Sequence, residues 1–231
     1  MGKRLYVPTR APDDWQRLLA DPAKHWKPGY SARALATCWE AAQAWPPAIA
    51  AILASSPNHA LAGAELLLAI PEYQVDLPPR GKPSQNDLFV LAKAADGQLI
   101  AATVEGKVNE PFGQTIAEWN AAGSPGKSAR LRFIGEQLGL PPSKLPGDVR
   151  YQLLHRTTSA LLLARRFNAR YAVMLVHSFS PTAAWFADFQ AFVGLFGVLA
   201  TERNVLLPLA VCEGISLYTG WVMGDPAYLQ A

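Results

Sequence analysis

The residues best suited to chemistry lie in two neighbouring segments of the chain. Asp87 leads into the apolar run LFVLA, and Glu105 and Lys107 end the run LIAATVEGK. Two acids and an amine form the layout of many phosphodiester-cleaving sites, in which carboxylates hold a divalent cation that neutralises the phosphate and activates water. The pattern therefore makes a metal-dependent phosphodiesterase the first hypothesis.

Both segments have the pattern of β-strands. Residues 99–108 alternate, so that an apolar face is opposed by a face carrying Thr103, Glu105 and Lys107. Residues 88–92 are apolar on both faces, which predicts a strand covered by helices on both sides. A turn at 95–98 would join the two strands as a hairpin and bring residue 87 opposite 105–107. Charges buried there need compensation, and a divalent cation is one possible source.

A purely structural explanation also fits these residues. Glu105 and Lys107 can form a surface ion pair beside a hairpin, and Asp87 can cap the preceding turn. The sequence leaves this alternative open.

The remaining elements define an α/β chain that we treat as a single domain over 1–231. Residues 1–57 are expected to form a helical N-terminal extension, and residues 58–231 an α/β core with a central mixed sheet flanked by helices. Helices are expected at 58–70, 114–120, 125–138, 149–167 and 181–200, and strands near 73–77, 87–93, 98–108, 170–177, 205–212 and 215–223.

The order of elements from residue 58, with an acid entering the second strand and Glu-x-Lys on the third, resembles the PD-(D/E)XK phosphodiesterase superfamily. The resemblance covers roughly residues 58–180 and implies a restriction-endonuclease-like α-β-β-β-α-β core. It implies that Asp87, Glu105 and the carbonyl of Gly106 bind Mg²⁺ or Mn²⁺, and that Lys107 orients or deprotonates water or stabilises charge. The superfamily's proline before the acid is absent, since Asn86 stands there.

Further polar residues are candidates for auxiliary roles under this resemblance. Glu65, in the helix expected before the first strand, is a candidate additional acid, with Glu72 competing for the same role. Gln152, His155 and Arg156 share one face of the expected 149–167 helix and could contact water or phosphate, as could Gln114. Each of these residues is also compatible with a solvated helix or loop surface.

Charge is unevenly distributed along the chain. The net charge is +3, but residues 127–170 contain nine basic residues against two acidic ones. This block could follow a nucleic-acid backbone, and Lys127, Arg130 and Arg132 are its candidate contacts. Solvated helix faces are the alternative. Two other functions compete with the phosphodiesterase. One is a catalytically inactive module that binds nucleic acid or a protein, and the other is a protein with a small-molecule or partner site between the N-terminal helices and the sheet.

Other features narrow the class of protein. The two cysteines, Cys38 and Cys212, are far apart and are expected to be reduced. No secretory leader or membrane span is apparent, so we expect a soluble, cytoplasmic protein without a membrane partner. Oligomeric state stays open, and a homodimer is compatible with the sequence. The N-terminal pattern W-x2-LLADPAKHW-x-PGYSARALA-x2-WEAA resembles that of an uncharacterised bacterial family, which implies no function.

Overall fold

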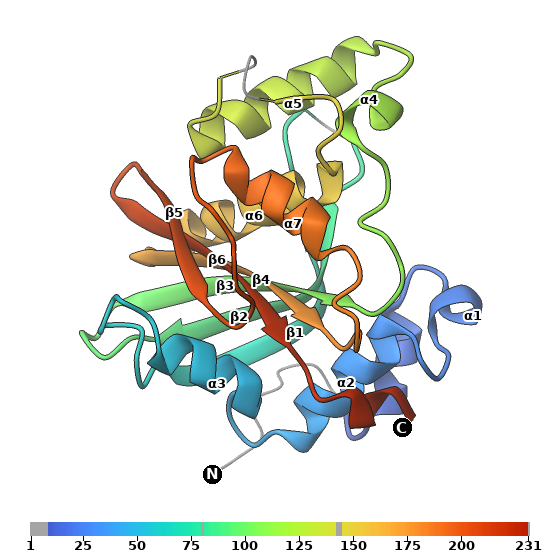
Figure 1. Cartoon of the computed structure of the whole chain (residues 1–231), viewed down its shortest axis with the longest axis vertical. Helices are drawn as coiled ribbons and strands as arrows, with labels where there is room; N and C mark the ends of the chain where they lie inside the picture. Colours follow the sequence, from blue (N-terminus) through green and yellow to red (C-terminus); the bar gives the residue numbers. More distant parts are fainter. Residues whose placement is uncertain (1–8, 80, 142–144, 231) are drawn as a thin grey trace.

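A single six-stranded mixed sheet organises the computed structural model, which describes residues 9–79, 81–141 and 145–230 (Figure 1). The strand order is β1-β2-β3-β4-β6-β5. β1–β2, β2–β3 and β5–β6 pair antiparallel, whereas β3–β4 and β4–β6 pair parallel. The strands are β1 (Glu65–Val75), β2 (Ser84–Lys93), β3 (Leu99–Lys107), β4 (Tyr171–Ser178), β5 (Leu206–Cys212) and β6 (Ile215–Met223). The expected α/β class with a mixed sheet flanked by helices is confirmed.

Helices cover both faces of this sheet. Figure 1 shows α5, α6 and α7 above the sheet and α2 and α3 below it. The α-helices are α1 (Pro22–His25), α2 (Ser31–Ala41), α3 (Pro47–Ala54), α4 (Ile116–Trp119), α5 (Pro125–Leu138), α6 (Tyr151–Arg166) and α7 (Phe186–Gly194). Two 3₁₀ helices, η1 (Pro12–Leu18) and η3 (Pro226–Gln230), lie near the ends of the described chain.

The central strands are apolar because they are buried on both sides. Leu88 and Val90 of β2 pack with the helices of the N-terminal half, and Phe89 and Leu91 pack under the second set of helices. The hairpin to β3 closes with Ala94 N–H donating to the Gln98 carbonyl at 2.8 Å, and Gly97 takes a positive φ of 83°. The predicted hairpin, its position and the alternation of β3 are therefore confirmed.

The expected helix at 58–70 is wrong. Residues 58–63 form turns, and the apolar run beginning at Glu65 is the first strand. Leucine-rich runs are compatible with either state in isolation. Here the segment pairs along β2 from Glu65↔Lys93 to Val75↔Ser84, so tertiary pairing outweighs the local helix preference. The helix expected at 181–200 is also shorter, covering only α7.

The N-terminal helices form one layer of the fold. Trp15, Leu35, Trp39 and Ile52 are buried in the same core as Val104 of β3. The region expected as an extension therefore covers the lower face of the sheet. Within the described part of the chain, no helix is both long enough and apolar enough to cross a membrane.

Candidate functional site

Asp87 and the end of β3 meet at one edge of the sheet. The backbone N–H of Gly106 donates a 2.8 Å hydrogen bond to Asp87 Oδ2. The pairing Leu88↔Val104 leads directly to this contact, because the next residue along each strand is Asp87 or Glu105. The hairpin thus brings the three sequence-predicted catalytic residues, Asp87, Glu105 and Lys107, to one place.

Glu105 is buried, with 3% of its surface exposed, and is held by positive and polar groups. Its Oε1 accepts hydrogen bonds from Lys107 Nζ at 2.8 Å and Gln152 Nε2 at 2.7 Å, and its Oε2 accepts one from Arg156 Nε at 2.6 Å. Burial alone would raise the pKa of Glu105, but Arg156 and Lys107 outweigh it and lower the pKa to about 2. Glu105 is therefore ionised across the physiological range.

Lys107 is equally enclosed, at 4% exposure. Besides its bond to Glu105, its ammonium lies 4.9 Å from the centroid of the Phe112 ring. A cation–π contact of this kind stabilises a desolvated ammonium without neutralising it. The lysine is thus fixed in orientation at the rim of the carboxylate site.

The first two turns of α6 supply the opposite wall of the site. Arg156 is anchored by its Nη1 donating to Ser84 Oγ at 3.1 Å, while its backbone carbonyl accepts from Thr103 Oγ1 at 3.1 Å. His155 Nδ1 lies 2.8 Å from the same Ser84 hydroxyl. Burial, reinforced by Arg156, holds the pKa of His155 well below its usual value, so this imidazole is neutral.

A third acid, Glu72, joins the site from β1. The paired residues Pro71↔Leu88 and Tyr73↔Asn86 leave Glu72 opposite Asp87, where its backbone takes a left-handed φ of 52°. Gln85 Nε2 donates to Glu72 Oε2 at 2.7 Å. Burial and the charge of Asp87 raise the pKa of Glu72 to about 8, and burial and Glu105 raise that of Asp87 to about 7. Three carboxyl groups therefore face two cations.

These groups line an open cavity of about 720 Å³. Gln114, Gln152, His155 and Arg156 all lie on its wall, as the sequence indicated. The side facing the N-terminal layer carries Lys24, His25 and Lys27, which are exposed. Among the described residues, Lys24 Nζ has no carboxylate partner, and Lys27 Nζ lies 5.9 Å from the Tyr30 ring centroid.

Glu65 does not join this site. It begins β1 opposite Lys93, at the end of the sheet away from Glu105, because the segment is a strand and not the expected helix. Of the two acids that competed for the auxiliary role, Glu72 is the one that the structure places beside Asp87. The reason is that residues 65–75 form one strand along the full length of β2, so that Glu65 and Glu72 lie toward opposite ends of this strand.

The basic residues of 127–170 are divided among different surroundings. Arg130 is buried, and its guanidinium donates to the carbonyls of Lys82, Leu77 and Pro79 at 2.7–2.8 Å. Lys127 Nζ donates to the Trp119 carbonyl, and Arg132 is exposed on another part of α5. Lys127 and Arg130 line a pocket next to the Arg156 cavity and are bound to backbone carbonyls, whereas Arg132 lines neither. Lys144 of the same block lies outside the described residues.

The carboxylate cluster suits a hard cation. Asp87 Oδ1 and one lone-pair position of Glu105 Oε2 remain beyond the hydrogen bonds described above. Burial first, and then the charge of a neighbouring carboxylate, raises the pKa values of Asp87 and Glu72. Within the described segments, no group of three or more His, Cys, Asp or Glu side chains is arranged as a metal site. One or two carboxylates together with substrate phosphate suffice for Mg²⁺, so this donor set fits.

A family model, described as Domain of unknown function (DUF6946), matches residues 8–226. The chain belongs to this family. Searches of curated proteins and of solved structures found no match. For this DUF6946 chain, the site geometry therefore carries the functional argument.

Several site residues were not anticipated from the DUF6946 sequence. Ser84, which bridges His155 and Arg156, lies in a loop-like stretch rich in turn residues. Lys24 and Lys27 lie in a segment with no strand or long helix to orient them. In the sequence these lysines stand out only by their positions on either side of His25. That spacing does not predict that they lie near the edge of the sheet.

Proposed function

We propose that this protein is a divalent-metal-dependent phosphodiesterase that cleaves nucleic acid at the Asp87–Glu105–Lys107 site. The observation that carries the proposal is the hydrogen bond from Gly106 N–H to Asp87 Oδ2, which sets two carboxylates and a fixed ammonium at the edge of one cavity. Such a constellation meets the two needs of phosphodiester hydrolysis, namely charge neutralisation and activation of water.

The topology supports the same proposal. Three antiparallel strands are followed by helices and a fourth strand, β4, parallel to β3. This order is compatible with the restriction-endonuclease-like core that the resemblance implies, with the acid near the start of β2 and Glu-x-Lys at the end of β3. The helix that precedes β1 in that arrangement would be α3 instead of the expected 58–70 segment.

Each residue has a role that follows from its position. Lys107, with its orientation fixed by Glu105 and Phe112, would stabilise the charge that develops on the phosphate. Arg156 would keep Glu105 ionised and oriented, and Gln152 would hold the other carboxylate oxygen. Lys24 and Lys27 would contact phosphates of the strand as it enters the cavity.

Asp87 and Glu105 are the side chains that would hold Mg²⁺ or Mn²⁺, with Glu72 opposite Asp87 on the neighbouring strand. The bound cation would supply charge neutralisation on the phosphate and a more acidic water. Its charge would also favour the ionised forms of Asp87 and Glu72, whose pKa values are raised by burial and by the neighbouring carboxylates. The resemblance adds the backbone carbonyl of Gly106 as a further ligand, and we include it in the proposed metal site.

Two observations favour competing functions. Glu105 is already neutralised by Arg156 and Lys107, as expected of a module that binds nucleic acid or a protein without cleaving. The cavity also lies between the N-terminal layer and the sheet edge, where a small phosphodiester would fit as well as a strand. Both alternatives use the same site. The first differs from the proposed function in lacking cleavage, and the second differs in its substrate.

A cleavage panel separates these possibilities. Purified protein is incubated with single- and double-stranded DNA and RNA, and with a small aryl phosphodiester, in Mg²⁺, Mn²⁺ or EDTA. We expect metal-dependent cleavage of at least one polynucleotide, with Glu65→Gln as an active control because Glu65 lies at the far end of the sheet. Cleavage of the small ester alone would support the small-molecule function, and an inert protein would support the binding module.

A further inference from the structure

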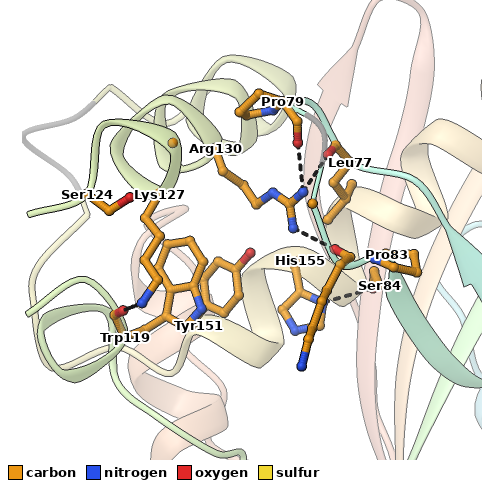
Figure 2. Close-up of a pocket in the computed structure, with 13 residues that line it drawn as sticks. Leu77, Pro79, Pro83, Ser84, Trp119, Ser124, Lys127, Arg130, Tyr151 and His155 are labelled. Carbon is orange, nitrogen blue, oxygen red and sulfur yellow. Dashed lines mark hydrogen bonds between the residues drawn. The ribbon is translucent and has the colours of Figure 1, made fainter. Parts of the chain in front are cut away.

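A second cavity of about 370 Å³ opens beside the catalytic one. Trp119, Tyr151 and His155 line both cavities, so the two adjoin at these rings. Figure 2 shows Trp119 and Tyr151 face to face on one side of the pocket, His155 and Ser84 on another, and the Arg130 guanidinium across from the rings. The pocket therefore has an aromatic wall within reach of the proposed reaction centre.

We propose that this pocket binds a nucleobase next to the cleaved phosphodiester, so that the substrate is a flexible single strand. The inference rests on the proposed function and adds the class of substrate. A base inside a duplex is paired and stacked, so it would have to leave the helix to enter the pocket. A single strand presents its bases without that cost, and aromatic side chains beside a backbone channel are the usual means of holding them.

The indole of Trp119 offers the stacking surface. One of its faces is covered by Tyr151, with ring centroids 3.9 Å apart and an interplanar angle of 13°. Lys127 Nζ lies 5.1 Å from the Trp119 ring centroid. Stacking of a base is generally stronger than an exposed cation–π contact. A base stacked on this ring would take the place of the ammonium over its face, while the bond from Lys127 Nζ to the Trp119 carbonyl keeps the charge beside the pocket.

The facing wall is held together by hydrogen bonds, which favours binding of a defined ring. Arg130 ties Leu77, Pro79 and Lys82 to α5 through their backbone carbonyls. A Cβ at position 81 would lie 2.9 Å from Arg130 Nη2, so a larger residue there would displace the guanidinium from its present position. A wall that is already ordered loses little conformational entropy on binding.

The pocket is also connected to the catalytic groups by hydrogen bonds. Ser84, on the pocket wall, contacts His155 Nδ1 and Arg156 Nη1, and Arg156 in turn holds Glu105. This chain sets the position of the pocket relative to the carboxylate that would act on the phosphate. Neutral His155 and the Ser84 hydroxyl present polar groups that could hydrogen-bond the edge of a base.

The test measures binding without metal, so that it does not depend on cleavage. Fluorescence anisotropy gives the affinity for a labelled single-stranded oligonucleotide, an abasic strand of the same length and charge, and the corresponding duplex. Competition with a free mononucleotide shows whether the pocket takes the base of a strand or a separate nucleotide. The variants are Trp119→Ala, Trp119→Phe and, as a control, Trp45→Ala, since Trp45 is half-buried and lines neither cavity.

We expect the wild type to bind the single strand about 10-fold more tightly than the abasic strand, and Trp119→Ala to lose that preference. Trp119→Phe should restore most of it, which a variant that merely misfolds would not do. Equal affinity for abasic and normal strands, or for duplex and single strand, overturns the inference even if the enzyme cleaves. If the free mononucleotide binds as tightly as the strand, the pocket takes a separate nucleotide, and the assignment of a single strand as substrate is overturned. Absence of binding to every polynucleotide would instead overturn the proposed function together with the inference.

Discussion

The Asp87 carboxylate accepts a 2.8 Å hydrogen bond from the backbone N–H of Gly106, the residue between Glu105 and Lys107. This bond joins the start of β2 to the end of β3 beyond their last ladder pair, Leu88↔Val104. It fixes Asp87 beside the Glu-x-Lys segment by a backbone group, so the contact survives changes to the neighbouring side chains.

Loss of either charged residue at the end of β3 should abolish cleavage. Lys107→Ala removes the ammonium that would stabilise developing charge, and we expect the rate to fall about 100- to 1000-fold. Glu105→Gln keeps the shape but leaves Arg156 and Lys107 buried without their carboxylate, so the free energy of unfolding should also fall by about 3 kcal/mol. Single-turnover assays and thermal melts measure both effects, with Lys93→Ala as the matched control at the far sheet end. A more stable Glu105→Gln protein would refute the ion-pair argument.

Asp87→Asn should separate stability from metal binding. The amide oxygen can still accept the Gly106 N–H, but the variant no longer places a third negative charge beside Glu105. In EDTA at pH 8 we expect the melting temperature to stay level or rise. Added Mg²⁺ should stabilise the wild type and leave the variant unchanged, because a cation bound only to the folded state raises its stability. Equal stabilisation of both proteins by Mg²⁺ would place the metal elsewhere.

Stability without metal should decline as the pH rises from 7 to 8.5. The folded pKa of Glu72 is raised to about 8 and that of Asp87 to about 7, above their values of 4.5 and 3.8 in the unfolded chain. Folded protein therefore holds these protons where unfolded protein has lost them, and the stability they contribute disappears as pH passes the folded pKa. We expect a loss of about 1–2 kcal/mol in chemical denaturation. Glu72→Gln should flatten most of this slope, and a slope identical to that of the wild type would contradict the assignment.

Arg130 should behave as a structural residue. Replacing it with lysine removes the planar guanidinium that reaches three carbonyls, which should lower the free energy of unfolding by about 2–3 kcal/mol and speed amide exchange at Leu77 and at residues 81–84. Arg132→Lys, two residues along the same helix but exposed, should change it by less than about 0.5 kcal/mol. If the two variants are equally stable, the loop is not held by Arg130.

The exposed lysines on the N-terminal side of the cavity should contribute to the salt dependence of binding. Replacing Lys24 and Lys27 together with glutamine removes two phosphate contacts, so the slope of log affinity against log salt for a single strand should become shallower by about 1.4. Lys93→Gln, which removes an exposed lysine at the opposite end of the sheet, should leave the slope unchanged. If the Lys93→Gln variant showed the same change in slope as the double lysine variant, the effect would come from net charge and not from contacts in the cavity.

The sequence by itself determined the parts of this protein that depend on local periodicity. Alternation in 99–107, the turn at 95–98 and the two-sided apolar run at 88–92 specified the β2–β3 hairpin, and the hairpin alone brings Asp87 to Glu105 and Lys107. Helical spacing likewise placed Gln152, His155 and Arg156 on one face of α6, which is where the structure has them. These relationships span few residues, so sterics and hydrophobic pattern suffice to define them.

Tertiary structure decided what depends on pairing between distant segments. The 65–75 run is helical by composition but becomes a strand because β2 offers a full ladder, and that choice moves Glu65 away from the site and brings Glu72 to it. Arg130 belongs by sequence to a basic block, yet its guanidinium is used by carbonyls that lie about 50 residues earlier in the chain. Lys24 and Lys27 face the cavity only because the N-terminal layer packs against the sheet. Each outcome is set by backbone groups seeking partners and by burial of apolar surface across the whole chain, neither of which a local pattern records.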